Sequence, residues 1–266
     1  MGAATALAGW LGRRNAVIAV LLAAAALAWA VTAALALGGM GAPGMPATMG
    51  LSVGPFLGVW ALMMAAMMLP AVAPVAALYL RALGASRPGR VAGFLGGYLL
   101  VWAAAGLPAY LLARAAGRLA ADQPRTAQVL AVATFVGVAV YQVSPLKRVC
   151  LRSCRSPLGQ FLRYAQVTGP LRDLRVGVHH GLYCLGCCWA LFVALMAVGL
   201  MNLVAMATLS GLVAAEKLWS HGVAASRLVA VGALGVAILL AARPELAQAL
   251  WTGSTTSPMP TDMPSM

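Results

Sequence analysis

The stretch that decides the fold is Val176-Gly-Val-His-His-Gly-Leu-Tyr-Cys-Leu-Gly-Cys-Cys-Trp-Ala-Leu-Phe-Val-Ala-Leu-Met-Ala-Val198, which contains no Asp, Glu, Lys or Arg. A helix rises about 1.5 Å per residue, so this run is long enough to cross the roughly 30 Å hydrocarbon core of a bilayer. Similar runs recur along the chain, of which 62% is hydrophobic and 9% charged, against about 25% charged residues in soluble domains. Because the runs are continuous rather than alternating, we predict an all-α, polytopic transmembrane helix bundle.

The apolar runs predict about seven membrane spans within a single transmembrane domain that covers residues 1–252. The expected spans are 15–37, 55–80, 91–113, 126–143, 176–198, 202–215 and 222–242. Residues 145–175 are expected to form a basic cytoplasmic loop, in which 158–167 could lie along the membrane as an interfacial helix. Residues 253–266, rich in Met, Pro, Ser and Thr, are expected to be a disordered tail.

The distribution of basic residues predicts the orientation of the bundle. With the N-terminus in the cytoplasm, 14 of the 18 Lys and Arg residues fall in inside segments and 4 in outside segments. Cytoplasmic segments of membrane proteins carry this excess, so we expect a cytoplasmic N-terminus and an outside C-terminus. The net charge of +13 is therefore an orientation signal, and no nucleic-acid partner is expected.

Sulfur and imidazole side chains gather on the predicted cytoplasmic side. They are Cys150, Cys154, His179, His180, Cys184, Cys187 and Cys188. On a helix His180, Cys184 and Cys188 repeat at i, i+4 and i+8 and share one face. Thiolates and imidazoles are the soft ligands that suit Cu(I) or Zn(II), so these residues are candidate metal ligands, with ordinary packing of buried cysteines as the alternative.

The basic loop is expected to activate its two cysteines. Lys147, Arg152 and Arg155 lie close in sequence to Cys150 and Cys154. Neighbouring cations lower thiol pKa values, so we expect both thiols to have lowered pKa values and to form thiolate, the form that binds metal.

Four of the chain's 14 methionines stand together in the second predicted span. Met63, Met64, Met67 and Met68 form two i, i+4 pairs on adjacent faces, and Pro70 follows them. Thioethers are soft ligands for Cu(I), so these residues are a candidate middle station; adaptable core packing is an equal alternative.

Few other polar residues lie near the spans. Glu216 and Lys217 are expected to pair with each other or with His221, and Asn202 is expected to cap the sixth predicted span. No Asp or Glu lies at mid-membrane in these predicted spans, which argues against a proton-coupled carrier of hard ions.

Six motifs together resemble a bacterial family of predicted metal-binding integral membrane proteins, a domain-of-unknown-function family. The motifs are Trp60-Ala-Leu-Met-Met-Ala-Ala-Met-Met-Leu-Pro70, Tyr141-Gln-Val-Ser-Pro-Leu-Lys147, Cys150-Leu-Arg-Ser-Cys-Arg155, Gly181-Leu-Tyr-Cys-Leu-Gly-Cys-Cys-Trp189, Gly199-Leu-Met-Asn202 and Glu216-Lys217. They cover roughly residues 54–243. The resemblance implies a multi-pass protein of the bacterial inner membrane with a metal role, and it implies no reaction.

Three functions remain open from the sequence. The leading hypothesis is a soft-metal protein, for copper above all, in transport, insertion or homeostasis, whose partners are the lipid bilayer, the metal ion and a protein in the membrane. The second is a membrane thiol–disulfide oxidoreductase that uses Cys184 and Cys187. The third is an assembly protein in which zinc, bound by Cys150, Cys154, Cys184 and Cys188, clamps the loop to the fifth span. No catalytic residue is assigned, and the balance is against an enzyme.

Overall fold

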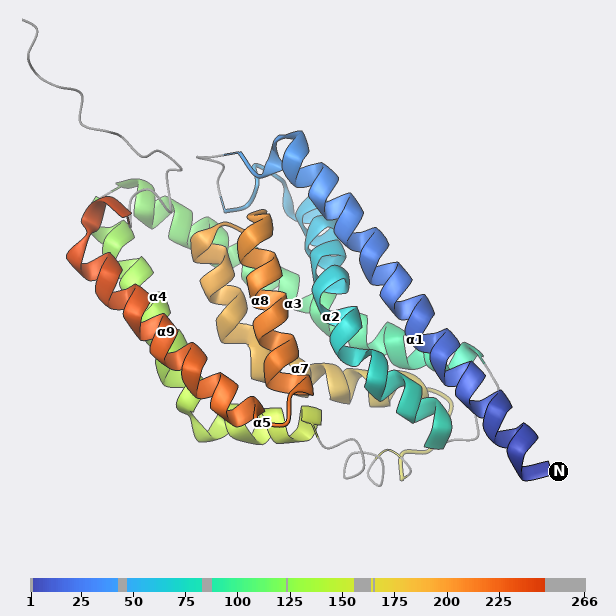
Figure 1. The fold of residues 1–266 in the computed structure, drawn as a ribbon. Helices are drawn as coiled ribbons and strands as arrows, with labels where there is room; N and C mark the ends of the chain where they lie inside the picture. Colours follow the sequence, from blue (N-terminus) through green and yellow to red (C-terminus); the bar gives the residue numbers. More distant parts are fainter. Residues whose placement is uncertain are drawn as a thin grey trace, which may run out of the picture.

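A computed structural model describes the backbone of residues 2–42, 47–82, 88–122, 124–155, 164 and 166–246, and the side chains of all of these except 2–14, 80–82, 88, 120–122 and 124. Every regular element in these ranges is helical (Figure 1): α1 Gly2–Leu35 with a π-helical extension Ala36–Met40, α2 Val53–Ala82, α3 Pro88–Asp122, α4 Pro124–Val143, α5 Pro145–Arg155, α7 Arg172–Val198, α8 Leu203–Leu218 and α9 Gly222–Ala242. The predicted all-α class is confirmed for the described residues.

Six of the described helices are long and apolar enough to cross a membrane. These segments are Asn15–Met40, Val53–Tyr79, Gly89–Leu119, Arg125–Val143, Arg172–Val198 and Gly222–Ala242. The sixth of the seven predicted spans corresponds to α8, whose 16 residues extend only about 24 Å. Seven full-length spans are therefore not confirmed, although each predicted segment does form a helix.

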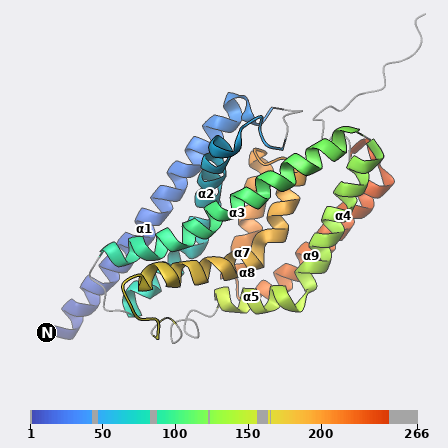
Figure 2. The same cartoon turned by 180° about the vertical axis from the view of Figure 1, so that it is seen from behind.

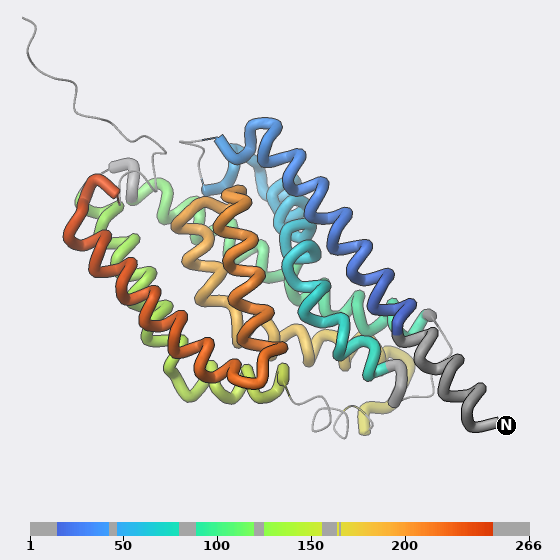
Figure 3. The backbone as a smooth tube through the Cα atoms, viewed as in Figure 1, coloured from blue at the N-terminus to red at the C-terminus, as the bar shows by residue number. Residues whose placement is uncertain are grey.

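The helices form an elongated bundle in which α7 and α8 lie between two helix pairs (Figure 1). The pair α1 and α2 packs on one side, and the pair α4 and α9 packs on the other. Seen from behind, α3 runs along α7 (Figure 2). The backbone trace shows that α5 and the start of α9 lie at one end, which we call the basic end, while the end of α1 and the α7–α8 turn lie at the opposite end (Figure 3).

Glycines set the close contact between α3 and α7. A Cβ atom at Gly97 would lie 2.1 Å from the carbonyl oxygen of Leu174, and one at Gly177 would lie 2.0 Å from that of Phe94. A Cβ atom at Gly93 would lie 3.1 Å from Asp173 Cβ. Small residues allow helix backbones to approach this closely, so Gly93 and Gly97 are packing residues of this contact. This close contact fixes the register in which the side chains of α3 pack against α7.

Residues 145–155, the first third of the predicted basic loop, form the helix α5. Ser144 accepts a hydrogen bond from the Lys147 backbone N–H at 3.1 Å, and Pro145 suits the first helical position. The face that turns inward consists of Lys147, Cys150, Leu151 and Cys154, whereas Arg148 and Arg152 are exposed. This i, i+3, i+4, i+7 spacing is helical, and α5 packs across α7 and α8 at the basic end. Most of the predicted interfacial helix (158–167) and all of the tail lie outside the described residues.

Candidate thiol site

Four cysteine thiols meet where α5 crosses α7. Cys154 Sγ lies 3.7 Å from Cys187 Sγ, and Cys187 Sγ lies 3.3 Å from Cys188 Sγ. Cys184 lies one turn before Cys187, whose thiol donates a hydrogen bond to the Cys184 carbonyl at 3.1 Å, and its sulfur interacts with the other three thiols. All four side chains are buried and unoxidised. We call Cys154, Cys184, Cys187 and Cys188 the thiol cluster.

Cys150 packs against α7 without joining this cluster. Its sulfur would lie 2.9 Å from a Cβ atom at position 186, so Gly186 makes room for it. Tyr141 of α4 donates a hydrogen bond to the Gly186 carbonyl on the same stretch of α7. No described sulfur contact joins Cys150 to the thiol cluster. Both α5 cysteines therefore contact α7, Cys150 at Gly186 and Cys154 at Cys187, but only Cys154 touches another thiol.

The expected lowering of the thiol pKa values on α5 is wrong. Burial raises the pKa of Cys150, and the nearby Lys147 ammonium opposes this only in part. The pKa of Cys154 is raised because this thiol is hydrogen-bonded to the Cys184 sulfur; the contact with Cys187 acts in the opposite direction and burial adds to the increase. The sequence places cations next to these cysteines, but the fold buries the thiols and directs the Lys147 ammonium toward Glu216 and the Cys187 carbonyl.

Lys217 and Tyr98 both contact the Cys184 sulfur. Lys217 Nζ donates a hydrogen bond to Cys184 Sγ at 2.8 Å, and Tyr98 Oη lies 3.0 Å from the same sulfur. The ammonium group stabilises negative charge on this sulfur. The expected pairing of Lys217 with Glu216 or His221 is wrong, because the two neighbours leave α8 in different directions. His221 Nδ1 instead lies 2.9 Å from the hydroxyl of the preceding serine.

A buried ion pair, Lys147 with Glu216, contacts the backbone of the thiol cluster at Cys187. Lys147 Nζ lies 2.6 Å from Glu216 Oε2, and each side chain is only 1% exposed. Lys147 also donates to the Cys187 carbonyl at 2.6 Å, and Gln142 donates to Glu216 Oε1 at 2.9 Å. Ser226 donates to the Gln142 carbonyl at 2.9 Å. This network connects α4, α5, α7, α8 and α9, so it fixes the position of the backbone that carries Cys187.

The two histidines lie beside the thiols rather than among them. His180 is buried, and its Nδ1 lies 3.4 Å from Tyr164 Oη. The ring of Tyr98, whose hydroxyl contacts the thiol cluster, lies 6.0 Å from the His180 ring. His179 stacks edge-on with Tyr164 and Tyr183. His180 therefore shares the buried face predicted from the helical spacing, one turn from Cys184, whereas His179 contacts aromatic rings beside it.

The candidate methionines are buried on α2. Met63, Met64, Met67 and Met68 are at most 3% exposed. They belong to the same continuous hydrophobic core as the thiol cluster, and α2 packs against α1, α3 and α8. Their burial is compatible with both the ligand and the packing interpretation.

Asn202 lies at the opposite end of the bundle from the thiol cluster. Its side-chain oxygen accepts a hydrogen bond at 3.0 Å from the backbone N–H of Ala205. The predicted N-cap of α8 is confirmed, and this residue has a structural role.

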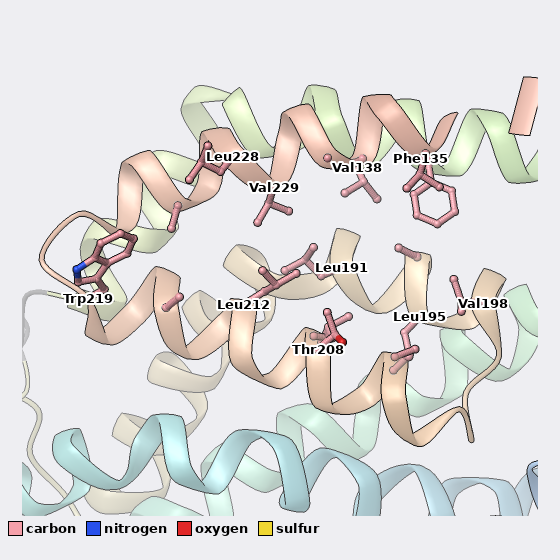
Figure 4. A pocket seen from close by; sticks show the side chains of 18 residues that line it. Phe135, Val138, Leu191, Leu195, Val198, Thr208, Leu212, Trp219, Leu228 and Val229 are labelled. Carbon is pink, nitrogen blue, oxygen red and sulfur yellow. The ribbon is translucent and has the colours of Figure 1, made fainter. Parts of the chain in front are cut away.

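An apolar cavity of about 570 Å³ separates the α4–α9 pair from α7 and α8 (Figure 4). Its walls are aliphatic and aromatic apart from the hydroxyl of Thr208 and the indole of Trp219. None of the thiol cluster lines it, so it offers no ligands for a metal ion.

The side chains as they stand do not form a completed metal site. Among the described residues, no group of three or more His, Cys, Asp or Glu side chains is arranged to hold a metal ion. What the fold provides is a buried group of soft donors with one cation beside it.

Comparison with known protein families assigns the chain. Residues 57–240 match the model of the PpoB2 family, described as copper chaperones. The chain belongs to this family. No curated protein and no solved structure matches it. This assignment is consistent with the metal-related family expected from the sequence motifs, and the description of the family points to a copper-related function. The matched region begins in α2 and ends in α9, so it includes the four α2 methionines and every residue of the thiol cluster.

Proposed function

We propose that this chain is an integral membrane protein that binds Cu(I) in the thiol cluster and passes it to a partner protein. In this proposal it resides in the bacterial inner membrane with the basic end in the cytoplasm. The family assignment supports copper as the cargo. The contact between Cys154 and Cys187 is the observation on which the choice of site depends, because it brings thiols from separate helices to one point.

The spacing of the sulfurs supports this choice. Two thiolates on one tetrahedral zinc ion, with metal–sulfur distances of about 2.3 Å, lie about 3.8 Å apart, which gives the scale of sulfur spacing around a soft metal ion. The separation of Cys154 and Cys187, 3.7 Å, is close to this value. Cys187 and Cys188, at 3.3 Å, have to separate slightly. A metal ion would thus require small side-chain rotations of the thiol cluster and leave the helices in place.

The surrounding residues have distinct roles in this proposal. Lys217 and Tyr98 hold the Cys184 sulfur when no metal is bound. Glu216 is a positioning residue that acts through Lys147 and the Cys187 carbonyl. Further candidate ligands are Cys150, His180 and His179 at the basic end, and Met63, Met64, Met67 and Met68 as a station deeper in the bundle.

The test is copper analysis of full-length protein purified without oxygen in detergent. We expect the variant with serine at all four thiol-cluster positions to lose bound copper, and Cys150→Ser to keep most of it. Equal copper in wild type and the fourfold variant would refute the proposal. Circular dichroism of each variant checks that the helices are retained. Replacing the four α2 methionines with leucine tests the deeper station. If these methionines only pack in the core, the transfer of copper to the partner protein should be unchanged.

A thiol–disulfide oxidoreductase is the second candidate, favoured by the same Cys154–Cys187 contact. The reacting pair would then be Cys154 and Cys187, instead of the Cys184 and Cys187 pair expected from the sequence. Thiol trapping followed by mass spectrometry distinguishes the two functions, because a redox cycle predicts a substantial disulfide fraction in cells. The zinc-clamp alternative is less well supported, because Cys150 has no contact with the thiols that were expected to share its metal.

A further inference from the structure

A small polar pocket lies at the corner where α4 turns into α5 beside the start of α9. Its volume is about 100 Å³. Its lining consists of Arg148 and Arg227, the aliphatic Val143, Leu151 and Val223, and three members of the buried polar network, Gln142, Lys147 and Ser226. The pocket is separate from the thiol cluster, and it combines two arginines with aliphatic walls.

Neither arginine forms an ion pair with another described residue. The ion pairs of the described residues join Arg90 with Asp173, Lys147 with Glu216 and Arg243 with Glu245. Glu216 of the neighbouring helix α8 is therefore already paired with Lys147. Arg148 donates a hydrogen bond at 3.2 Å to the backbone carbonyl of Val143. This carbonyl is uncharged, so it does not neutralise the guanidinium group. Both arginines are exposed.

Arg227 lies more than one turn inside α9. It is the sixth residue of α9, and so its Cα lies about 8 Å inside a helix of membrane-spanning length. A charged side chain at that depth extends toward the headgroup level to avoid hydrocarbon. On α9 this direction leads to the α4–α5 corner, where Arg148 lies.

The neighbouring surface is suited to acyl chains. Val140 and Val143, on the last turns of α4, are 63% and 49% exposed, and Val223 is 39% exposed. A soluble anion gains nothing from such surface, whereas the acyl chains of a lipid whose phosphate sits between the arginines would cover it. Basic pockets between transmembrane helices on the cytoplasmic side are typical sites for anionic lipid headgroups.

We propose that Arg148 and Arg227 bind the phosphate of an anionic phospholipid whose acyl chains lie along α4 and α9. The inference rests on the proposed membrane insertion of the bundle and does not depend on copper. Binding there would hold α4, α5 and α9 together at the corner beside the buried Lys147–Glu216 pair.

The experiment uses the full-length protein in nanodiscs of phosphatidylcholine with or without phosphatidylglycerol, followed by native mass spectrometry of the lipids it retains. We expect wild type to retain phosphatidylglycerol selectively, and Arg148→Gln with Arg227→Gln to reduce that retention about tenfold. Arg243→Gln is the matched control, since Arg243 is exposed, lies at the opposite end of α9 and is paired with Glu245; it should behave like wild type. Each single variant is measured as well, and an intermediate loss is expected.

Two results would overturn the inference. One is equal retention of phosphatidylglycerol by wild type and the double variant. The other is displacement of the lipid by millimolar inorganic phosphate, which would identify a site for a soluble anion. Copper content is measured on the same samples. A copper-free protein that still selects phosphatidylglycerol would refute the proposed function and leave the lipid site standing.

Discussion

Removing one partner of the Lys147–Glu216 pair should destabilise the bundle far more than removing both. In Glu216→Gln the Lys147 ammonium remains 1% exposed and loses its anionic partner, so that only neutral acceptors such as the Cys187 carbonyl remain. The amide that replaces the carboxylate can accept a hydrogen bond but carries no charge to offset the buried cation.

The structure sets the magnitude of this effect. Breaking a buried ion pair by removing one partner costs about 3–5 kcal/mol, because the remaining charge stays uncompensated. At about 1.4 kcal/mol per tenfold change, the ratio of folded to unfolded protein should fall by a factor of roughly 150 to 4,000. The double variant Lys147→Met, Glu216→Gln leaves no charge, and its loss should be about 1–2 kcal/mol, mainly from the unpaired polar groups.

The assay is unfolding in mixed detergent micelles, followed by circular dichroism. The exposed pair of Arg243 and Glu245, whose side chains are 66% and 62% exposed, provides the control. Glu245→Gln should change the free energy of unfolding by no more than about 1 kcal/mol. If Glu216→Gln is as mild as Glu245→Gln, or if the double variant is less stable than the single one, the reasoning is wrong.

Further perturbations test the helix contacts and the thiols. Gly97→Ala should abolish correct folding, because its Cβ would overlap a backbone carbonyl of α7. The control Gly96→Ala, whose Cβ meets no atom within 4 Å, should be neutral or stabilise the protein by up to about 1 kcal/mol. If Gly97→Ala keeps the monodisperse wild-type peak in size-exclusion chromatography, this reasoning is wrong. Because the pKa of Cys154 is raised, its proton competes with metal at neutral pH, so copper affinity should increase from pH 6 to pH 8 in a competition titration, and a flat profile would exclude this thiol as a ligand. Mild peroxide should link Cys154 to Cys187 in preference to any disulfide of Cys150, as read by peptide mapping. Asn202→Ala should lower the free energy of unfolding by about 1 kcal/mol, and an unchanged midpoint would refute its role as a cap.

The polar contacts of the site are where prediction from sequence failed. The side chains of Glu216 and Lys217 are adjacent in sequence, but they point to different partners on α5 and α7. Local spacing cannot reveal this, because both partners come from helices distant in the chain. Tyr98 was also missed. Its position directly after Gly97 offered a signal, since a residue beside a close helix contact is held against the facing helix.

What the sequence by itself determined is the set of long apolar helices, whereas α5 was expected as part of a loop. Long apolar runs can bury their backbone polar groups in lipid only as helices, so composition and run length were sufficient. The helical spacing of His180, Cys184 and Cys188 similarly determined that they share a face.

Only the tertiary structure decided which thiols meet. The period of α5 turns Cys154 toward Cys187 and places Cys150 against Gly186, a difference that depends on the crossing of two helices. The same crossing buries Lys147 and raises the pKa values of the α5 thiols. The basic residues next to Cys150 and Cys154 in the sequence had instead predicted lowered pKa values. Burial and partner choice are properties of packed surfaces, and the order of residues along the chain does not specify them.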